Sequence, residues 1–186
     1  MKSDFDGDIK IYQKKSDIEA GEFDGLVKDI DFHKANGNTK KAQQLGAEFA
    51  SLKPTDEALG ILRPEDKLPA EFLYQARVLI TFLCGRVTRE AIDDQILSNL
   101  VRNAMYDHLK EHENGYYKNI ADGAAFTFYR LAMKKGTDRA EEIGKEFAKM
   151  CAVKNDDSLV SLGKKIYLNT TTHVNPFLTS VTFSIK

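Results

Sequence analysis

The sequence predicts an all-α protein, either a multi-helix bundle or a short αα-superhelix. Glycines, prolines and helix-capping residues divide the chain into about eight segments whose apolar residues recur at helical spacing. These segments cover roughly two-thirds of the chain, against about one-third in an average globular protein. The length of 186 residues suits one domain, so we expect a single all-helical domain over residues 1–186.

Each predicted helix begins near a capping residue or a proline and ends near a glycine or before a proline, which are the usual start and stop signals. The third helix is short because Pro64 stops it. In chain order the predicted helices span residues 16–35, 39–52, 55–63, 69–84, 89–113, 117–134, 138–152 and 158–168.

In the first half of the chain, Ser16 and Thr39 are the predicted N-caps of the first two helices, and Gly37 and Pro54 stop them. Pro69 fits the first turn of the fourth helix, where a missing N–H group costs no intrahelical hydrogen bond. This fourth helix is apolar on nearly every side, which is typical of a helix buried in a protein core.

In the second half, Thr88 is the predicted N-cap of the longest helix, and Gly115 stops it. The next helix is mostly apolar and ends before Thr137, which caps the helix that follows. Asp157 or Ser158 caps the last predicted helix.

The two ends of the chain differ from its helical middle. Residues 177–185 alternate with a period of two and contain β-formers, and Ile9 and Ile11 alternate more briefly. We therefore predict an N-terminal extension over residues 1–15 and an extended C-terminal segment over residues 169–186. We favour a tail or a partner-dependent strand for this segment; the alternative is a small β-ribbon that joins the two termini.

Two stretches of the sequence, residues 39–50 and 137–148, are similar to each other. Each contains a glycine beside a large apolar residue, Gly46 in the first and Gly144 in the second. A glycine inside a helix lowers helix propensity, so its presence favours close approach by a neighbouring helix. The similarity reflects either a true repeat or two amphipathic helices that resemble each other by chance.

The overall charge and the cysteine content limit the function classes. The chain has 27 Lys and Arg against 28 Asp and Glu, a net charge of -1, which argues against a basic nucleic-acid-binding protein. No apolar run approaches the roughly 18 residues of a membrane span. The first ten residues carry three Asp and no apolar core, unlike a signal peptide, and two cysteines cannot form a secreted disulfide framework. We expect a cytoplasmic protein with no nucleic-acid or membrane partner and no cofactor.

The sharpest local pattern is an H-x-x-E-H sequence formed by His108, Glu111 and His112. Residues four apart share a helix face, so both imidazoles could bind one Zn²⁺ ion while the glutamate acts as a base. The pattern resembles the motif of inverted zinc peptidases, which implies a metal-dependent hydrolase. We favour the alternative, a solvated helix end whose histidines complement the helix dipole. The candidates for a third zinc ligand are Glu141, Glu142 and His173.

A second candidate site is the polar strip of Tyr74, Arg77 and Thr81 on the otherwise apolar fourth helix. A buried arginine needs a negatively charged partner, and that partner could be an anionic ligand held between helices. The alternative, which we favour, is a structural ion pair with a carboxylate of the chain itself.

A third candidate site is formed by Arg86 and Arg89, which flank Thr88 at the predicted start of the longest helix. Unpaired backbone N–H groups at a helix start, together with two guanidinium groups, could bind a phosphate.

The leading functional prediction is a non-enzymatic module for protein interaction or self-association, with a protein partner or a second copy of the chain. It rests on the many helices, the two similar stretches, the extended C-terminal segment and the lack of a convincing catalytic set. The alternatives are a zinc-dependent hydrolase at residues 108–112 and a binder of an anion or small ligand between helices.

Overall fold

The computed structural model describes residues 20–63, 65–153 and 156–185. Eight α-helices and one short 3-10 helix hold 77% of the described residues, and no β-strand occurs in these ranges. This confirms the prediction of an all-α helical bundle. The helices are α1 (Ala20–Ala35), α2 (Asn38–Ser51), η1 (Glu57–Leu59), α3 (Ala70–Ala91), α4 (Gln95–His112), α5 (Asn114–Asp122), α6 (Ala125–Ala132), α7 (Arg139–Met150) and α8 (Asp157–Ser180).

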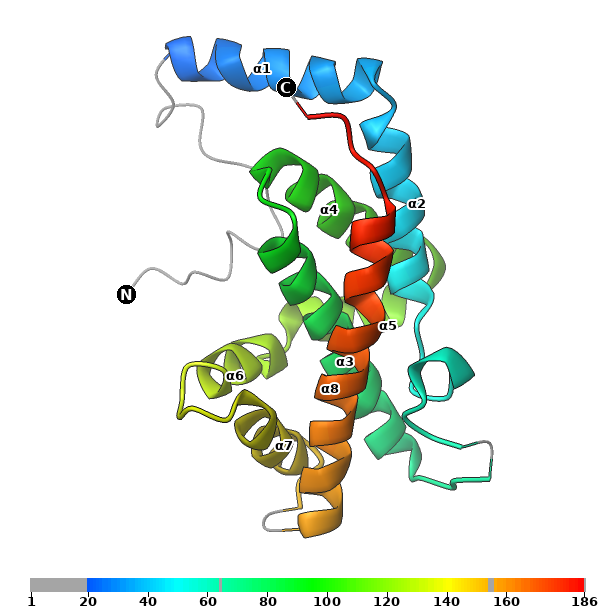
Figure 1. Ribbon diagram of the computed structural model, residues 1–186. Coiled ribbons are helices and arrows are strands. Elements are labelled where there is room, and N and C mark those ends of the chain that lie inside the picture. The colour runs from blue at the N-terminus through cyan, green and yellow to red at the C-terminus, as the bar shows by residue number, and fades with distance from the viewer. Residues whose placement is uncertain (1–19, 64, 154–155, 186) are drawn as a thin grey trace.

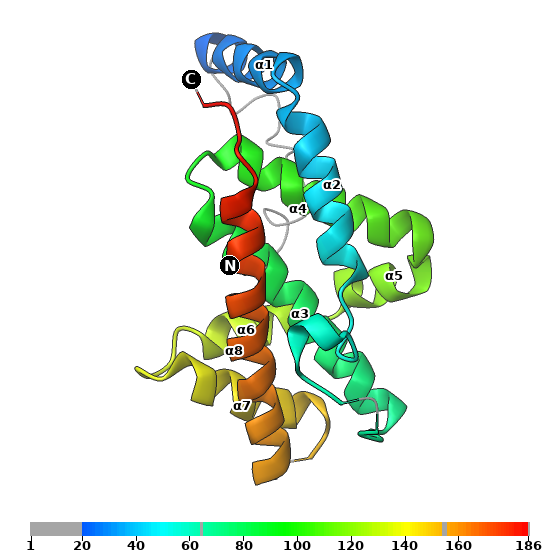
Figure 2. The same ribbon diagram turned by 45° about the vertical axis from the view of Figure 1, so that its right-hand side comes forward.

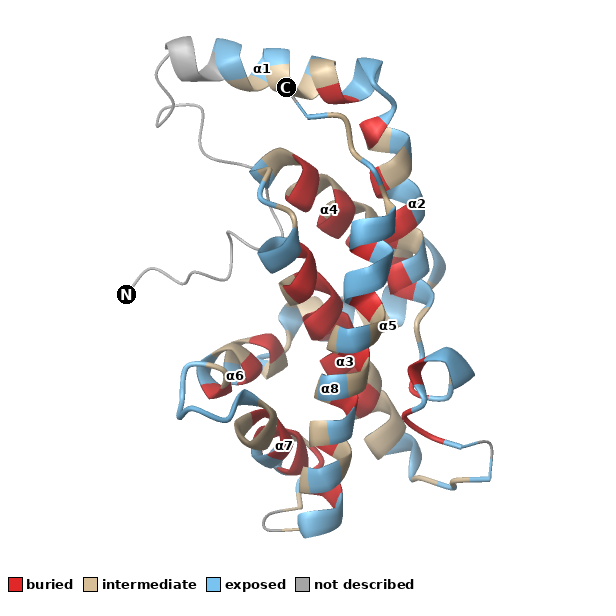
Figure 3. Cartoon of the chain, in the orientation of Figure 1, coloured by how far each residue is buried: buried red, intermediate tan, exposed pale blue. Residues whose placement is uncertain are grey.

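Helix α3 is the most deeply buried helix of the bundle (Figure 3). Half of its 22 residues are buried, and Leu79, Ile80 and Leu83 have no exposed surface. It packs against α4, α6, α7 and α8. The predicted burial of the fourth helix is therefore confirmed, and an all-round apolar sequence was the correct signal for it.

Helix α8 runs along most of the length of the molecule (Figures 1 and 2). Its first half packs on α7, its middle crosses α3, and its C-terminal end lies beside α2. Helix α2 packs in turn along α4. Residues 181–185 leave the end of α8 and continue past α2 toward α1 (Figure 1).

Three glycines allow the closest helix pairs to form. A Cβ atom on Gly46 of α2 would lie 2.6 Å from the Cβ atom of Ala104 on α4, which is too close for two carbon atoms. Gly144 of α7 and Gly163 of α8 face each other, and a Cβ on Gly163 would lie 2.9 Å from the Cα of Gly144. The predicted close approach at Gly46 and Gly144 is confirmed, because only a hydrogen atom fits at these positions.

The predicted start of the longest helix at residue 89 is wrong. Helix α3 continues through Gly85 to Ala91, and α4 begins at Gln95. The Oγ1 of Thr88 donates to the carbonyl of Cys84 at 2.7 Å, so this threonine lies inside α3 and caps nothing. Asp94 is the actual N-cap, since its carboxylate accepts from two backbone N–H groups of the first turn of α4.

Other boundaries differ by less. The predicted helix over 117–134 is divided into α5 and α6 at Gly123, where the backbone is extended. Asp138 rather than Thr137 caps α7, and Asp156 rather than Asp157 or Ser158 caps α8. In each case a carboxylate accepts backbone N–H groups of the first helical turn.

The predicted extended segment over residues 169–186 is wrong for its first twelve residues, since α8 continues to Ser180. Thr170, Val174 and Leu178 recur every four residues and are buried, so helical packing prevails over the period-two pattern of residues 177–185. Pro176 lies inside this helix on its exposed side. Extended chain begins only at Val181.

The predicted N-terminal extension over residues 1–15 lies outside the described residues, and so does the N-terminal strand of the alternative terminal ribbon. Within the described ranges, no helix combines the length and the apolar character that a membrane crossing requires.

Candidate functional site: an arginine pocket between α3, α4 and α6

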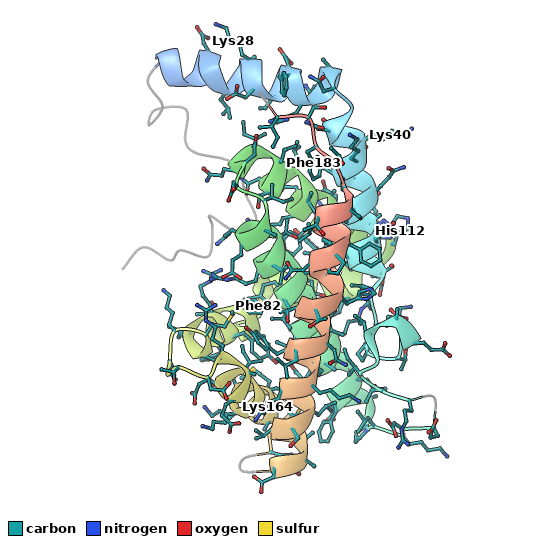
Figure 4. The ribbon with its side chains drawn as sticks, in the orientation of Figure 1. Lys28, Lys40, Phe82, His112, Lys164 and Phe183 are labelled. Atoms are coloured by element: carbon teal, nitrogen blue, oxygen red, sulfur yellow. The ribbon has the colours of Figure 1, made fainter. Side chains whose placement is uncertain are left out.

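The two histidines of the H-x-x-E-H sequence lie next to each other in the last two turns of α4. Their rings stack with centroids 4.2 Å apart, and the Nδ1 of His112 lies 3.0 Å from the backbone carbonyl of His108. His112 and Glu111 are exposed (Figure 4). The structure thus brings the two histidines together at a solvated end of α4. There they can complement the helix dipole, as the alternative to a zinc site requires.

Among the described residues, no third zinc ligand joins this pair. Glu141 binds Lys164, and Glu142 binds Lys145, both through side-chain hydrogen bonds at the surface of α7. His173 packs its ring against Phe177 on α8. Throughout the described part of the chain, no group of three or more His, Cys, Asp and Glu side chains is placed to share a metal ion.

The polar strip on α3 forms a structural cluster with the start of α5. Arg77 makes a two-pronged ion pair with Glu113, and its guanidinium lies 4.3 Å from the ring centre of Tyr116. The Tyr116 hydroxyl is 2.8 Å from the Oγ1 of Thr81, and its ring meets that of Tyr74 edge-on. The partner that Arg77 requires is therefore a carboxylate of the chain itself.

These contacts change the titration of the cluster. The hydrogen bonds from Arg77 hold the pKa of Glu113 below its usual value. Burial raises the pKa of the Tyr116 hydroxyl, and the nearby Arg77 offsets only part of that effect. At neutral pH the cluster therefore contains a charged ion pair and a neutral phenol, an arrangement suited to joining α3 to α5.

The arginines of the third candidate site lie at a different place from the predicted one. Arg86 and Arg89 are in the last two turns of α3 and not at a helix start, so the predicted phosphate site at free backbone N–H groups is wrong. Both side chains instead line a pocket, together with Arg102 from α4 and Arg130 from α6. The enclosed space among these groups is small, about 30 Å³, and the pocket opens to solvent.

Arg102 is the most deeply placed of the four arginines. Only 5% of its surface is exposed, and its Nη1 donates to the Oδ1 of Asn99 at 3.3 Å. Burial lowers the pKa of Arg102, and the positive charge of Arg89 lowers it further. Both effects oppose the charged form of Arg102, and the neighbouring Tyr106 offsets part of them.

Aromatic side chains form the rest of the pocket wall. Phe82 lies where α3 meets α6 (Figure 4), and its ring centre is 5.6 Å from that of Phe126. Tyr106 is buried beside Arg102, and burial raises the pKa of its hydroxyl, which stays protonated at neutral pH. Gly85 lies beside these groups, and a Cβ at this position would make an ordinary contact of 3.6 Å with the Tyr106 hydroxyl oxygen.

All four arginines interact with other groups of the chain. Arg86 pairs with Glu90 one turn further along α3, and this pair is largely exposed. Arg89, Arg102 and Arg130 come from three helices and converge on the same pocket. Sequence reasoning missed Arg102 and Arg130, although an arginine on the apolar face of a predicted helix, as Arg102 is, was a usable signal.

Two further hollows lie elsewhere on the surface. One follows the contact of α2 with α4 and is lined by polar and acidic side chains, including His108 and Glu111. The other lies between the start of α3 and the end of α7, beside Tyr74 and Cys151. Burial raises the pKa of the Cys151 thiol to about 12, which leaves it unreactive at neutral pH.

Comparison with protein-family models, with curated proteins and with solved structures gave no match to this chain.

Proposed function

We propose that this protein is a non-enzymatic binding protein that takes a phosphate-bearing ligand in the pocket between α3, α4 and α6. The observation that carries the proposal is the convergence of four guanidinium groups from three helices on one pocket, with Arg102 almost wholly buried. Guanidinium groups bind phosphate oxygens through paired, charge-assisted hydrogen bonds, and burial strengthens such bonds.

The pocket wall supports the same proposal. Tyr106 offers a protonated hydroxyl as a further hydrogen-bond donor beside Arg102. Phe82 and Phe126, both buried, supply an apolar part of the pocket wall. The described residues that line the pocket include no nucleophile beside a base, so we propose binding without a reaction.

The proposal is tested by calorimetric titration with inorganic phosphate and diphosphate, at an ionic strength held constant with KCl. We expect diphosphate to bind, and Arg89→Gln and Arg130→Gln each to weaken binding by about tenfold or more. Arg139→Gln, at an exposed arginine on α7, is the matched control and should leave the affinity unchanged. Equal loss in Arg139→Gln, or no binding to the wild type, contradicts the proposal.

A second candidate function is the docking of a protein partner or a second copy of the chain on α6. It is favoured by Phe128 and Leu131, which are 43% and 48% exposed on the outer side of this helix. Large apolar side chains that lie together at the surface often mark an interaction site. Light scattering of the wild type and of a Phe128→Ser, Leu131→Ser double variant tests self-association; a monomeric wild type removes the second copy as the partner.

We also keep the cytoplasm as the proposed compartment. Cys84 and Cys151 are both free and buried, as is usual for thiols in a reducing environment. Detection of the tagged protein in fractionated cells tests this proposal.

A further inference from the structure

The C-terminal residues are held at the corner between α1 and α2 by one buried side chain. The Nδ2 of Asn38 donates to the carbonyl of Ser184 at 2.8 Å, and the backbone N–H of Ser184 donates to the Oδ1 of Asn38 at 3.0 Å. Lys41 adds a bond of 2.6 Å from its Nζ to the carbonyl of Thr182. Asn38 thus pairs with the backbone of Ser184 as a neighbouring β-strand would.

His33 contacts the same amide from the end of α1. Its Nδ1 lies 3.0 Å from the Nδ2 of Asn38, and its Nε2 lies 3.3 Å from the carboxylate of Asp94. His33 and Asn38 are both buried. A single chain of contacts therefore connects Asp94 at the start of α4, through His33 and Asn38, to the C-terminal residues.

The bonds to Ser184 determine where the proton of His33 lies. The N–H of Ser184 is a donor, so the atom that faces it must be the oxygen of the Asn38 amide. The Nδ2 atom then has two hydrogens, one for the Ser184 carbonyl and one for the Nδ1 of His33. Nδ1 must therefore be an unprotonated acceptor, and the ring proton is on Nε2, next to Asp94.

A second proton on His33 is incompatible with this arrangement. It would place an N–H on Nδ1, opposite the N–H of the Asn38 amide. Rotating the amide by a half turn would present its oxygen to Nδ1, but it would also place oxygen against the carbonyl of Ser184 and nitrogen against the N–H of Ser184. Both bonds to Ser184 would then be lost.

Three charged groups lie near His33 in space or in sequence. Asp94 lies against Nε2, and Asp29 is one turn earlier on α1. Lys41 on α2 carries a positive charge, but it is already bonded to the carbonyl of Thr182 and is partly solvated. Histidine is in general the side chain that changes charge between about pH 5 and pH 8.

We propose that residues 181–185 form a pH-sensitive strap, which is docked while His33 is neutral and released when His33 takes up a proton. Val181 and Phe183 pack against the core in the docked state, and Figure 4 labels Phe183 on this segment between α8 and α1. Release therefore exposes apolar side chains and the surface that they cover. This inference does not depend on the arginine pocket.

The test is an NMR titration of the full chain from about pH 7.5 to about pH 5, a range that spans histidine protonation. The measured quantity is the exchange protection of the Ser184 amide, relative to an unstructured peptide at the same pH. We expect protection to fall by at least about tenfold across the range, because two hydrogen bonds are lost. A Ser184 amide that stays protected at pH 5 overturns the proposal, whatever the charge of His33.

Two variants and one control separate the switch from a general loss of structure. Asp94→Asn keeps a good helix cap but removes the charge that stabilises protonated His33, so release should move to lower pH. His33→Gln cannot take up a proton and should keep the strap docked at pH 5. His173→Gln, at a histidine on α8, should leave the profile unchanged. Release of the strap in His33→Gln at the wild-type pH overturns the proposal, as does a change caused by His173→Gln.

Discussion

Gly144 of α7 and Gly163 of α8 contact each other where these two helices cross. A Cβ on Gly163 would lie 2.7 Å from the Cβ of Phe147 as well as 2.9 Å from the Cα of Gly144. The backbones of α7 and α8 therefore approach as closely as two helices can, and α8 is fixed against the part of the bundle that also contains α6.

Replacing Gly163 by alanine should destabilise the protein by about 1–3 kcal/mol, because the added methyl group overpacks the contact with Phe147 and Gly144. Chemical unfolding in urea measures the change. Gly25→Ala is the matched control: it lies inside α1 with no atom within 4 Å of the added carbon, so it should stabilise the helix by about 0.5–1 kcal/mol. A Gly163→Ala variant as stable as Gly25→Ala would show that the contact is looser than described.

Replacing Glu113 by glutamine should lower the free energy of unfolding at pH 7 by about 2 kcal/mol, because half-buried Arg77 loses its carboxylate partner. The pKa of Glu113 is depressed in the folded state, so its contribution is fully present above the unfolded value of about 4.3 and is lost as pH falls through the folded value. The difference between wild type and variant should therefore be present at pH 7 and disappear in strong acid. Urea unfolding at several pH values measures it.

Glu90→Gln is the control for this experiment. It removes the partner of Arg86, which is more exposed than Arg77, and about 0.5 kcal/mol or less is expected for this pair. If the two substitutions lowered the free energy of unfolding equally, the burial of Arg77 would not strengthen its ion pair with Glu113.

Replacing Asp94 by alanine should cost about 1–2 kcal/mol, since two backbone N–H groups at the start of α4 lose their acceptor. Thr88→Val tests the alternative boundary. If Thr88 were the N-cap, Thr88→Val would cost as much as Asp94→Ala. Inside α3 the Thr88 hydroxyl only bonds back to the carbonyl of Cys84, so replacement by the near-isosteric valine should cost less than Asp94→Ala. Thermal unfolding of both variants decides between the two helix starts.

Replacing Leu178 by alanine should cost about 2–4 kcal/mol, because this side chain is buried in the last turns of α8. Phe177→Ala changes the preceding, exposed residue and should cost less than about 1 kcal/mol. An extended tail at residues 169–180 would make both substitutions nearly neutral, so their difference in denaturant midpoint tests the helical end.

The helices were predictable wherever apolar spacing and a clear stop agreed, as at Gly37 and before Pro54. The boundary between α3 and α4 was not, because Thr88 and Asp94 are both good N-caps in sequence, and only the burial of α3 through Gly85 separates them. Similarly, a period of two in residues 177–185 concealed a helix whose buried face depends on contacts with α2 and α3.

The candidate site was predictable only in part. The sequence indicated Arg86 and Arg89 as an anion-binding pair, but that prediction relied on a helix start at residue 89, and the structure has no helix start there. Arg102 and Arg130 lie on other helices, and no local pattern shows that they meet the first two. The partner of Arg77 was predictable in kind, since a buried arginine needs a carboxylate, while the identity of Glu113 depends on how α5 turns back onto α3.

The length of α8 has a consequence for how the molecule melts. The N-terminal half of α8 packs against α7, and the residues that follow its C-terminal end are hydrogen-bonded to α2. The two ends of the bundle therefore share this one helix as a packing partner. Unfolding of α8 at one end of the bundle would remove packing contacts at the other end as well. We therefore expect optical probes placed at opposite ends to report one cooperative transition at a shared midpoint.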